Sequence, residues 1–307
     1  MAAPLLALAC PHCGAPLHPR FGGEAVCSYC GRSLTGVPEA SWGALLGSLE
    51  DVDDLEDGRV SCRVAGQRFV LRGLLGRGAR SSVFLAERGR PVELVVLKVR
   101  SGRSDQGSPA REWKVLTHLA RVDAEGGALF SNLVLQPVAS GALTSRETSE
   151  RPALVYRWQS GFSHTLRGVA AAYPDGVDAR TAVWMWRRIL GVLGWVHGSG
   201  VVHGAVTADH VLIHPRDHRA LLVGWGAASD DVPPPGDDLK SSASCIRGVF
   251  GRGAVDAPRA LIELLAETER GAIGGLDAAS LSREVARVAE EAFGPPKFHP
   301  FTMPVSR

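Results

Sequence analysis

The stretch VVHGAVTADHVLIHP, residues 201–215, decides which fold this chain is expected to adopt. Apolar runs at its two ends predict short buried segments on either side of a loop. Loops held between buried segments commonly carry functional side chains. This loop has a histidine after the first valines, but it continues through Ala205 and Thr207 to His210. The stretch therefore has the pattern of a catalytic loop without an evident catalyst.

Length, charge and hydropathy limit the class of protein. With 307 residues, 45% of them hydrophobic, the chain can fill one large domain or a small and a medium one. The net charge of +2 does not favour nucleic acid or an anionic membrane as partner. Apolar runs such as Leu94–Leu97 are far below the roughly 20 residues of a membrane span. The start MAAPLLALAC lacks the basic region of a signal peptide, so we expect a soluble, cytoplasmic protein.

Four of the six cysteines form two Cys-x-x-Cys-Gly pairs separated by thirteen residues. Each pair suits a tight turn, because the glycine that follows can take a positive φ angle. Four thiolates at this spacing are typical of a structural zinc ribbon, since they complete a tetrahedral site. Two disulfides or a redox pair are the alternatives, but neither would explain why the same Cys-x-x-Cys-Gly turn occurs twice. The predicted zinc ligands are Cys10, Cys13, Cys27 and Cys30, while Cys62 and Cys245 are expected to be buried apolar residues.

Composition divides the chain into segments. Residues 1–35 hold the predicted zinc ribbon, and residues 36–59 have the glycine, serine and acidic side chains of a solvated linker. The pattern beyond them is globular. We expect a strand-rich lobe over 60–158, a helical lobe over 159–293 and a C-terminal tail over 294–307.

The strand-rich lobe contains one charged residue that needs a partner. Runs rich in Val, Leu and Phe predict strands at 68–71, 82–86 and 93–99. The turn between the first two contains Gly76-Arg77-Gly78, a weak signal because hairpins use glycine in any case. Lys98 is flanked by apolar residues, so it either meets a partner or extends past the strand edge. A helix predicted to begin at Ser108-Pro109 carries Glu112, which could be that partner.

In this order the features resemble the small lobe of the protein kinase family, with its G-x-G-x-x-G-x-V turn, V-A-I-K strand and helix glutamate. Two positions depart from the family pattern. Ser81 replaces the third glycine, and Val96 stands where a small alanine usually lies over the adenine, which narrows the pocket. The nucleotide-binding residues that the resemblance implies are Gly76, Gly78, Val83, Val96, Lys98 and Glu112.

The opening stretch lies where kinases have the catalytic loop H-R-D-L-x-x-x-N. His203 matches this loop, but the catalytic aspartate position is Ala205 and the metal-binding asparagine position is His210. Nineteen residues after Ala205, Gly224-Trp225-Gly226 replaces D-F-G, so the metal-holding aspartate is Gly224. Phosphoryl transfer depends on these side chains to orient the acceptor and to hold magnesium. The resemblance implies that the fold is kept while the chemistry is lost.

The remaining chain resembles the helical lobe of the same family. Apolar spacing predicts helices over 163–172, from Asp178 to Gly198, over 258–268 and over 278–293. Another helix begins near Asp238 and resembles the kinase helix whose leading aspartate ties down the catalytic loop. Asp237 could do the same, and either residue could be simply an N-cap. The segment 227–236, between Gly226 and this helix, is too short for an activation loop with a phosphorylation site.

The predicted fold is α+β: a bilobal protein-kinase-like fold preceded by a small zinc ribbon. We expect a pseudokinase, a regulatory or scaffolding module that binds proteins through both parts and could still hold ATP without productive metal. No catalytic residue is assigned. The alternative is an active atypical Ser/Thr kinase or phosphotransferase in which Asp209 acts as base or metal ligand. A solvent-exposed loop residue is the favoured interpretation of Asp209, because no second metal ligand is evident. Few aromatic and basic residues alternate in the ribbon, which does not favour nucleic acid binding.

Overall fold

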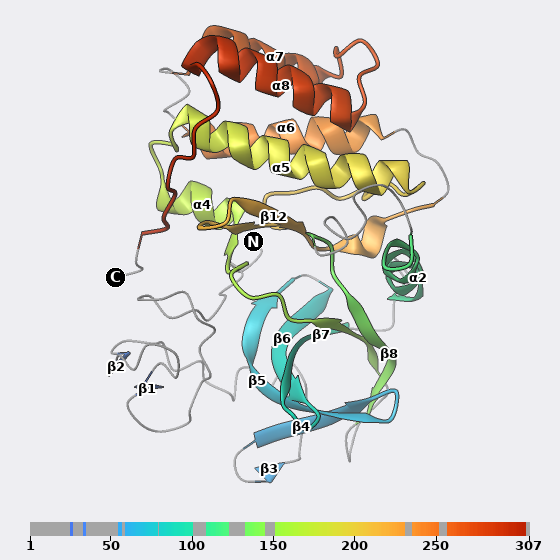
Figure 1. Ribbon diagram of the computed structural model, residues 1–307. Coiled ribbons are helices and arrows are strands. Elements are labelled where there is room, and N and C mark those ends of the chain that lie inside the picture. The colour runs from blue at the N-terminus through green and yellow to red at the C-terminus, as the bar shows by residue number, and fades with distance from the viewer. Residues whose placement is uncertain are drawn as a thin grey trace. The chain divides into compact units, whose positions relative to one another are not determined.

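The computed structural model describes residues 25–26, 33–34, 55–56, 59–78, 80–100, 109–122, 133–144, 151–230, 235–251 and 257–304 (Figure 1). The chain forms two compact units. The first extends to Trp113 and includes Pro137–Ser163, and the second comprises Lys114–Gln136 and His164–Pro304. Most of the predicted ribbon and linker lies outside the described residues. Within that part the structure gives an antiparallel pair, β1 (Ala25–Val26) and β2 (Ser33–Leu34).

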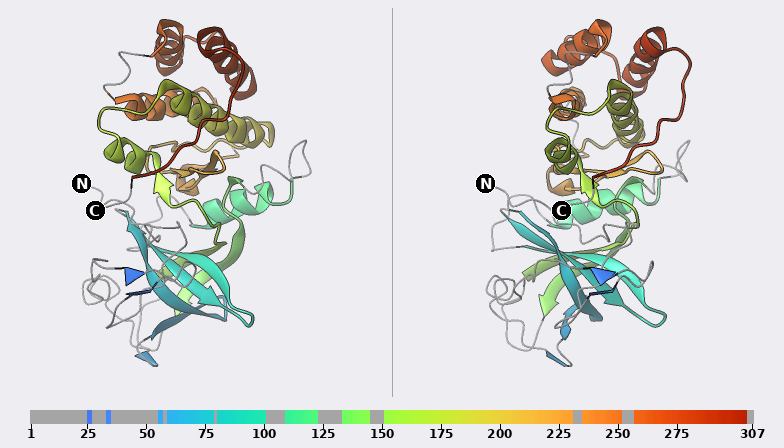
Figure 2. Two further views of the ribbon diagram at one scale, coloured as in Figure 1. Left: turned by 60° about the vertical axis from the view of Figure 1, so that its left-hand side comes forward. Right: turned by 90° about the vertical axis from the view of Figure 1, so that its left-hand side faces the viewer.

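The first unit is built on a seven-stranded antiparallel sheet in the order β3-β4-β5-β6-β7-β9-β8. An additional pairing between β4 and β8 closes the sheet into a barrel, which Figures 1 and 2 show from three sides. The strands are β3 (Leu55–Glu56), β4 (Arg59–Val64), β5 (Gln67–Arg77), β6 (Ser81–Arg88), β7 (Glu93–Arg100), β8 (Pro137–Thr144) and β9 (Arg151–Arg157).

The two faces of this sheet have different roles. Successive side chains of a strand point to opposite faces, so alternate residues share a face. On β7 the odd-numbered residues Val95, Leu97 and Val99 belong to the apolar core of the barrel. The even-numbered residues Val96 and Lys98 lie on the other face. The strand predicted at 93–99 therefore divides its side chains between core and candidate site.

Helix α2 (Pro109–Leu119) begins at the predicted proline and carries Glu112 in its first turn. Its apolar positions Val115, Leu116 and Leu119 are buried, as their helical spacing predicts. The helix crosses the boundary of the two units, because Glu112 belongs to the first and Lys114 to the second.

The second unit is mainly helical and includes a small three-stranded sheet in the order β10-β11-β12. Its inner elements are β10 (His164–Thr165), α4 (Leu166–Ala172), α5 (Ala179–Gly198), β11 (Val211–His214), β12 (Arg219–Leu222), the short helix η2 (Trp225–Ala227) and α6 (Gly236–Phe250). Asp178 caps α5 as predicted, its carboxylate accepting from the Arg180 backbone N–H at 2.8 Å. The apolar stripe of α5 is buried against neighbouring elements.

The helix predicted at 163–172 begins later than expected, at Leu166. His164 and Thr165 instead pair with Ile213 and Leu212 on β11. The Thr165 hydroxyl accepts from the Gly168 backbone N–H at 3.0 Å and so caps the helix. A strand pairing with a segment about fifty residues away has no local sequence signal, which explains the difference.

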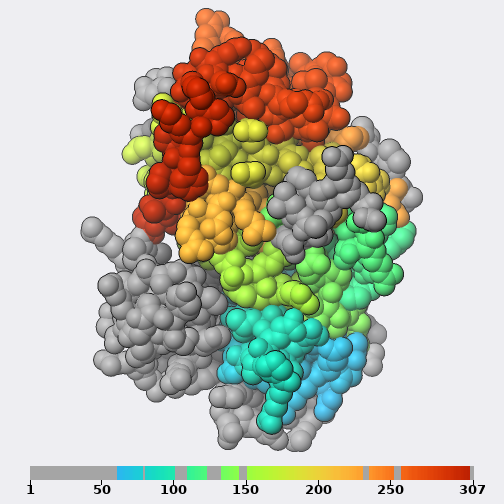
Figure 3. Space-filling view, in the orientation of Figure 1, coloured from blue at the N-terminus to red at the C-terminus, as the bar shows by residue number. Residues whose placement is uncertain are grey.

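Helices α7 (Arg259–Arg270) and α8 (Ala278–Phe293) complete the unit. The tail beyond Gly294 lies on the surface beside the β11–β12 hairpin, as the dark-red atoms in Figure 3 show. Its Phe298 ring stacks on His218 with centroids 4.4 Å apart, and Phe301 is buried. Phe301 therefore packs into the unit, whereas Phe298 contacts His218 but remains 66% exposed. No helix within the described part of the chain is long and apolar enough to cross a membrane.

Candidate functional site

The predicted partnership of Lys98 and Glu112 is confirmed. The Lys98 ammonium donates to both carboxylate oxygens, at 2.6 Å from Oε2 and 3.0 Å from Oε1. A third residue, which sequence reasoning missed, completes this group: the Tyr156 hydroxyl donates to Glu112 Oε1 at 2.6 Å. Glu112 is 2% exposed and Tyr156 1%. Burial, and then the adjacent carboxylate, hold the pKa of Tyr156 well above its usual value, so the phenol keeps its proton.

Strand register brings the other predicted nucleotide-binding residues to the same sheet face. Val83 lies directly opposite Lys98, and Tyr156 directly opposite Val96. Gly76 is paired with Val83 on the neighbouring strand. Gly78 follows in the turn, where its backbone N–H donates to the Ser81 carbonyl at 2.8 Å. One sheet face therefore carries a cation and two valines, with the glycine turn at its end.

The loop at 201–215 is held by a buried, neutral His203. Its Nδ1 accepts from the Ala205 backbone N–H at 3.2 Å, so the proton lies on Nε2, which bonds the Val223 carbonyl at 3.1 Å. The Trp225 ring packs edge-on against the imidazole, with centroids 4.5 Å apart. His203 is fully buried and both of its ring nitrogens are hydrogen-bonded, so it is a core residue.

Asp238, in the first turn of α6, holds this loop in place. Of the two aspartates that the sequence offered for this role, Asp238 and Asp237, it is Asp238 that makes the contacts. Its carboxylate accepts the backbone N–H groups of His203 at 2.8 Å and Gly204 at 2.9 Å, and it bonds His197 Nε2 at 3.0 Å. Burial acts to raise the pKa of Asp238, but these donors outweigh it and lower the pKa below its usual value. Asp237 is exposed and pairs with Lys240 instead.

His210 fills the space that a side chain at position 224 would need. Gly224 has a φ angle of +81°, in the left-handed region that favours glycine. A Cβ atom built there would lie 2.5 Å from Cγ and 2.6 Å from Nε2 of His210. The imidazole is fixed by a 2.8 Å hydrogen bond from Nδ1 to the Ala205 carbonyl. The histidine and the glycine therefore pack against each other, and position 224 has no room for a side chain while His210 stays in place.

A second glycine in the loop is also required by its surroundings. Gly204 stands where kinases have arginine, at a φ angle of +70°. A Cβ atom there would come within 2.7 Å of the Ala227 backbone oxygen. The side chain of Ala205, the next residue, has no oxygen that could bind a metal or orient an acceptor hydroxyl. Mg²⁺ prefers oxygen ligands in octahedral geometry, so the side chains at 205, 210 and 224 do not fit a magnesium ion.

Asp209, the alternative catalytic residue, is engaged elsewhere. Its carboxylate accepts a 2.6 Å hydrogen bond from Arg167 Nε at the start of α4, and the hydrogen bond and charge of Asp209 raise the pKa of Arg167. The Arg167 backbone N–H also bonds the Ala208 carbonyl at 3.0 Å. These contacts give Asp209 a structural role at the junction of loop and helix.

The predicted zinc ligands, Cys10, Cys13, Cys27 and Cys30, lie outside the described residues. The described residues contain no cluster of three or more histidine, cysteine, aspartate or glutamate side chains suited to a metal. Cys62 and Cys245 are buried free thiols, as predicted. Burial raises the pKa of Cys62 to about 12 and that of Cys245 to about 11, so both stay protonated at neutral pH.

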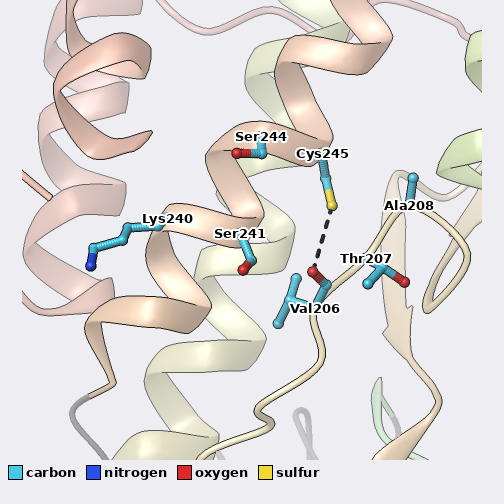
Figure 4. A pocket seen from close by; sticks show the side chains of 7 residues that line it. All are labelled: Val206, Thr207, Ala208, Lys240, Ser241, Ser244 and Cys245. Carbon is cyan, nitrogen blue, oxygen red and sulfur yellow. Dashed lines mark hydrogen bonds between the residues drawn. The ribbon is translucent and has the colours of Figure 1, made fainter. Parts of the chain in front are cut away.

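A shallow pocket of about 340 Å³ in the second unit lies between the loop and α6. In Figure 4 the Lys240 ammonium points away from the loop, and the Cys245 thiol points at the Val206 carbonyl, 4.0 Å away. The polar groups that line the pocket do not point toward one place, so they do not form a binding site for a nucleotide or a metal. The lining residues are Val206, Thr207, Ala208, Lys240, Ser241, Ser244 and Cys245.

The closed barrel with its lysine–glutamate pair, and the helical unit with its loop and hairpin, define a protein-kinase-like fold. Among solved structures, the chain is similar to the BubR1 kinase domain, with a TM-score of 0.58 and 14% identity over 81% of this chain and 92% of that one. It is also similar in structure to vaccinia related kinase 3, with a TM-score of 0.56 and 14% identity over 80% of this chain and 95% of that one. No family model matches the sequence, nor does any curated protein.

Proposed function

We propose that this chain is a pseudokinase: a catalytically impaired protein-kinase-like protein that acts as a regulatory or scaffolding binding module. The observation that carries the proposal is the packing of His210 over Gly224. The kinase resemblance expects metal ligands at positions 210 and 224. Here the His210 ring occupies the space that a side chain at position 224 would need, so it leaves no room for a carboxylate there.

Phosphoryl transfer is nearly all positioning and charge neutralisation, so the missing groups are the ones it depends on. Ala205 cannot orient an acceptor hydroxyl, and Gly224 cannot hold a metal. The ion pair of Asp209 with Arg167 opposes the alternative in which Asp209 takes over as base. The buried anchor at Asp238 supports a loop kept for the fold.

The sheet face around Lys98 supports nucleotide binding without productive metal. The Lys98 side chain is 20% exposed while it contacts Glu112, so it is not fully enclosed. ATP is the cofactor we propose for this face, with structural zinc at the four cysteines of the N-terminal segment. The partners proposed are proteins bound by the kinase-like domain and the ribbon, in the cytoplasm.

A thermal-shift titration of the full chain with ATP, with and without Mg²⁺ or Mn²⁺, tests the proposal. We expect a shift that does not depend on metal, that Lys98→Ala removes and that Lys114→Ala, an exposed lysine of the same helix region, retains. We expect no phosphate release. A metal-dependent shift with phosphate release that Asp209→Asn abolishes would establish the phosphotransferase alternative, and no shift at all would leave a scaffold without nucleotide.

The triple variant Ala205→Asp, His210→Asn, Gly224→Asp is the positive control for metal. It restores the oxygen ligands and removes the imidazole that blocks position 224. We expect a magnesium-dependent ATP shift in the triple variant and none in Gly224→Asp alone, because His210 still occupies the space.

Metal analysis tests the ribbon separately. Purified protein should contain about one zinc per chain, and Cys10→Ser or Cys27→Ser should release it. Pull-downs with the ribbon intact or deleted then divide the protein partners between the two parts of the chain.

A further inference from the structure

Glu112 holds more hydrogen bonds than its pairing with Lys98 requires. Oε1 receives two donors, Lys98 at 3.0 Å and Tyr156 at 2.6 Å, while Oε2 receives Lys98 at 2.6 Å. The two donors differ in mobility. Lys98 is a flexible chain, whereas the Tyr156 ring is 1% exposed and fixed on β9 opposite Val96. The carboxylate therefore has one mobile donor and one fixed donor.

This difference matters when Lys98 contacts anything else. A buried carboxylate that loses its only partner is strongly destabilised, since the charge is left uncompensated in a poorly hydrated site. With Tyr156 in place, Glu112 keeps a charge-assisted hydrogen bond after the ammonium departs. The phenol remains a donor throughout the neutral range because its pKa lies well above the usual value.

We propose that Tyr156 is a positioning residue that holds Glu112, and with it the first turn of α2, on the sheet while the Lys98 ammonium turns to an anionic ligand. The ligand in this statement is the nucleotide polyphosphate of the proposed function. The hold of Tyr156 on α2 does not depend on that function. Helix α2 is then fixed by the protein's own side chains, in the presence or absence of ligand.

Hydrogen exchange on the full chain tests the hold without any ligand. Lys98→Met removes the ammonium but keeps an unbranched side chain that is one atom shorter, and Tyr156→Phe removes only the hydroxyl. We expect each single variant to speed exchange of the α2 amides by roughly threefold to tenfold, and the double variant by roughly a hundredfold or more, because Glu112 then has neither donor. Tyr173→Phe, which removes a tyrosine hydroxyl that bonds the Thr302 carbonyl, should leave α2 unchanged.

Three outcomes of this exchange experiment would overturn the proposal. Lys98→Met could release α2 as fully as the double variant, in which case Tyr156 holds nothing. The double variant could leave α2 protected, in which case the network does not fix the helix. Tyr156→Phe could speed exchange equally throughout the first unit, in which case its role is general packing.

Binding of ATP in EDTA to the same variants tests the hand-over of Lys98. We expect Tyr156→Phe to weaken binding about tenfold, because Lys98 must then stay with Glu112, and Lys98→Met to abolish it. Unchanged affinity in Tyr156→Phe would overturn the hand-over. If the wild-type chain does not bind ATP, the proposed nucleotide function fails, while the exchange experiment still decides whether Tyr156 fixes α2.

Discussion

The sheet face around Lys98 and the loop around His203 differ in which of the charged residues expected from the kinase resemblance they contain. Both are places where the kinase resemblance expects charged side chains. On the sheet face the ion pair of Lys98 with Glu112 is present and reinforced by Tyr156. In the loop the expected carboxylates are absent, and His210 occupies the space beside Gly224.

The contrast separates charges that hold structure from charges that serve chemistry. Asp238 separates the two kinds of charge, because it is a buried carboxylate that contacts the same loop. Its partners are the backbone N–H groups of the loop, so it stabilises the fold whether or not a reaction takes place. Under the proposed function, the positions that lack a carboxylate are those that would face a substrate or a metal.

Replacing Asp238 should have the largest effect on stability. Asp238→Ala removes the acceptor of the His203 and Gly204 backbone N–H groups and of His197, so we expect a loss of about 4 kcal/mol in the free energy of unfolding. Urea unfolding measures it. Asp237→Ala is the matched control and should cost under about 0.5 kcal/mol, because its pair with Lys240 is exposed. Equal losses in the two variants would mean that the loop is not anchored through Asp238.

Gly224→Ala should have the next largest effect, about 3 kcal/mol, since it combines a positive φ angle with a collision against His210. In the His210→Ala background the collision is absent, and only the backbone term of about 1 kcal/mol should remain. A double-mutant cycle measures this coupling. Additive losses would show that the two positions are independent, which would remove the main support for the proposed function.

Tyr156 should make the protein sensitive to alkali. Its pKa in the folded protein is raised above the unfolded value of about 10, so its contribution is complete below pH 10 and declines as pH rises toward the folded pKa. We expect the free energy of unfolding to fall by about 1.4 kcal/mol per pH unit just above pH 10 from this group. Tyr156→Phe should remove that slope, and Tyr173→Phe should not. The tyrosinate absorbance of the folded chain gives an independent check.

Local sequence patterns predicted much of the fold. Helix α8 has its predicted bounds because its apolar stripe has the helical period and Asp277 caps it at Ser280. Strand β8 was not predicted, since Pro137–Thr144 consists mainly of small residues and gains its strand form from pairing with β9 and β4. Local propensity cannot supply a pairing between distant segments.

The candidate site was predictable where spacing alone determines contacts. Lys98 and Glu112 could be matched from their places on a strand and a helix. Tyr156 could have been found only by knowing that it is opposite Val96, which depends on the register between β7 and β9. The sequence contains both His210 and Gly224, but their contact depends on the loop conformation and on a glycine with positive φ.

Replacing Asp209 should have the smallest effect on stability. It also tests directly whether the loop catalyses phosphate release. Its pair with Arg167 is largely exposed on the arginine side, so Asp209→Asn should change the free energy of unfolding by at most about 0.5 kcal/mol. ATP affinity and phosphate release should stay at wild-type levels, because an ion pair at a helix start contributes only to local structure. Arg167→Gln is the control and should match Asp209→Asn in both measurements. If Asp209→Asn abolished a phosphate release that Arg167→Gln retained, Asp209 would be a base in its own right, and the altered loop would still carry out a reaction.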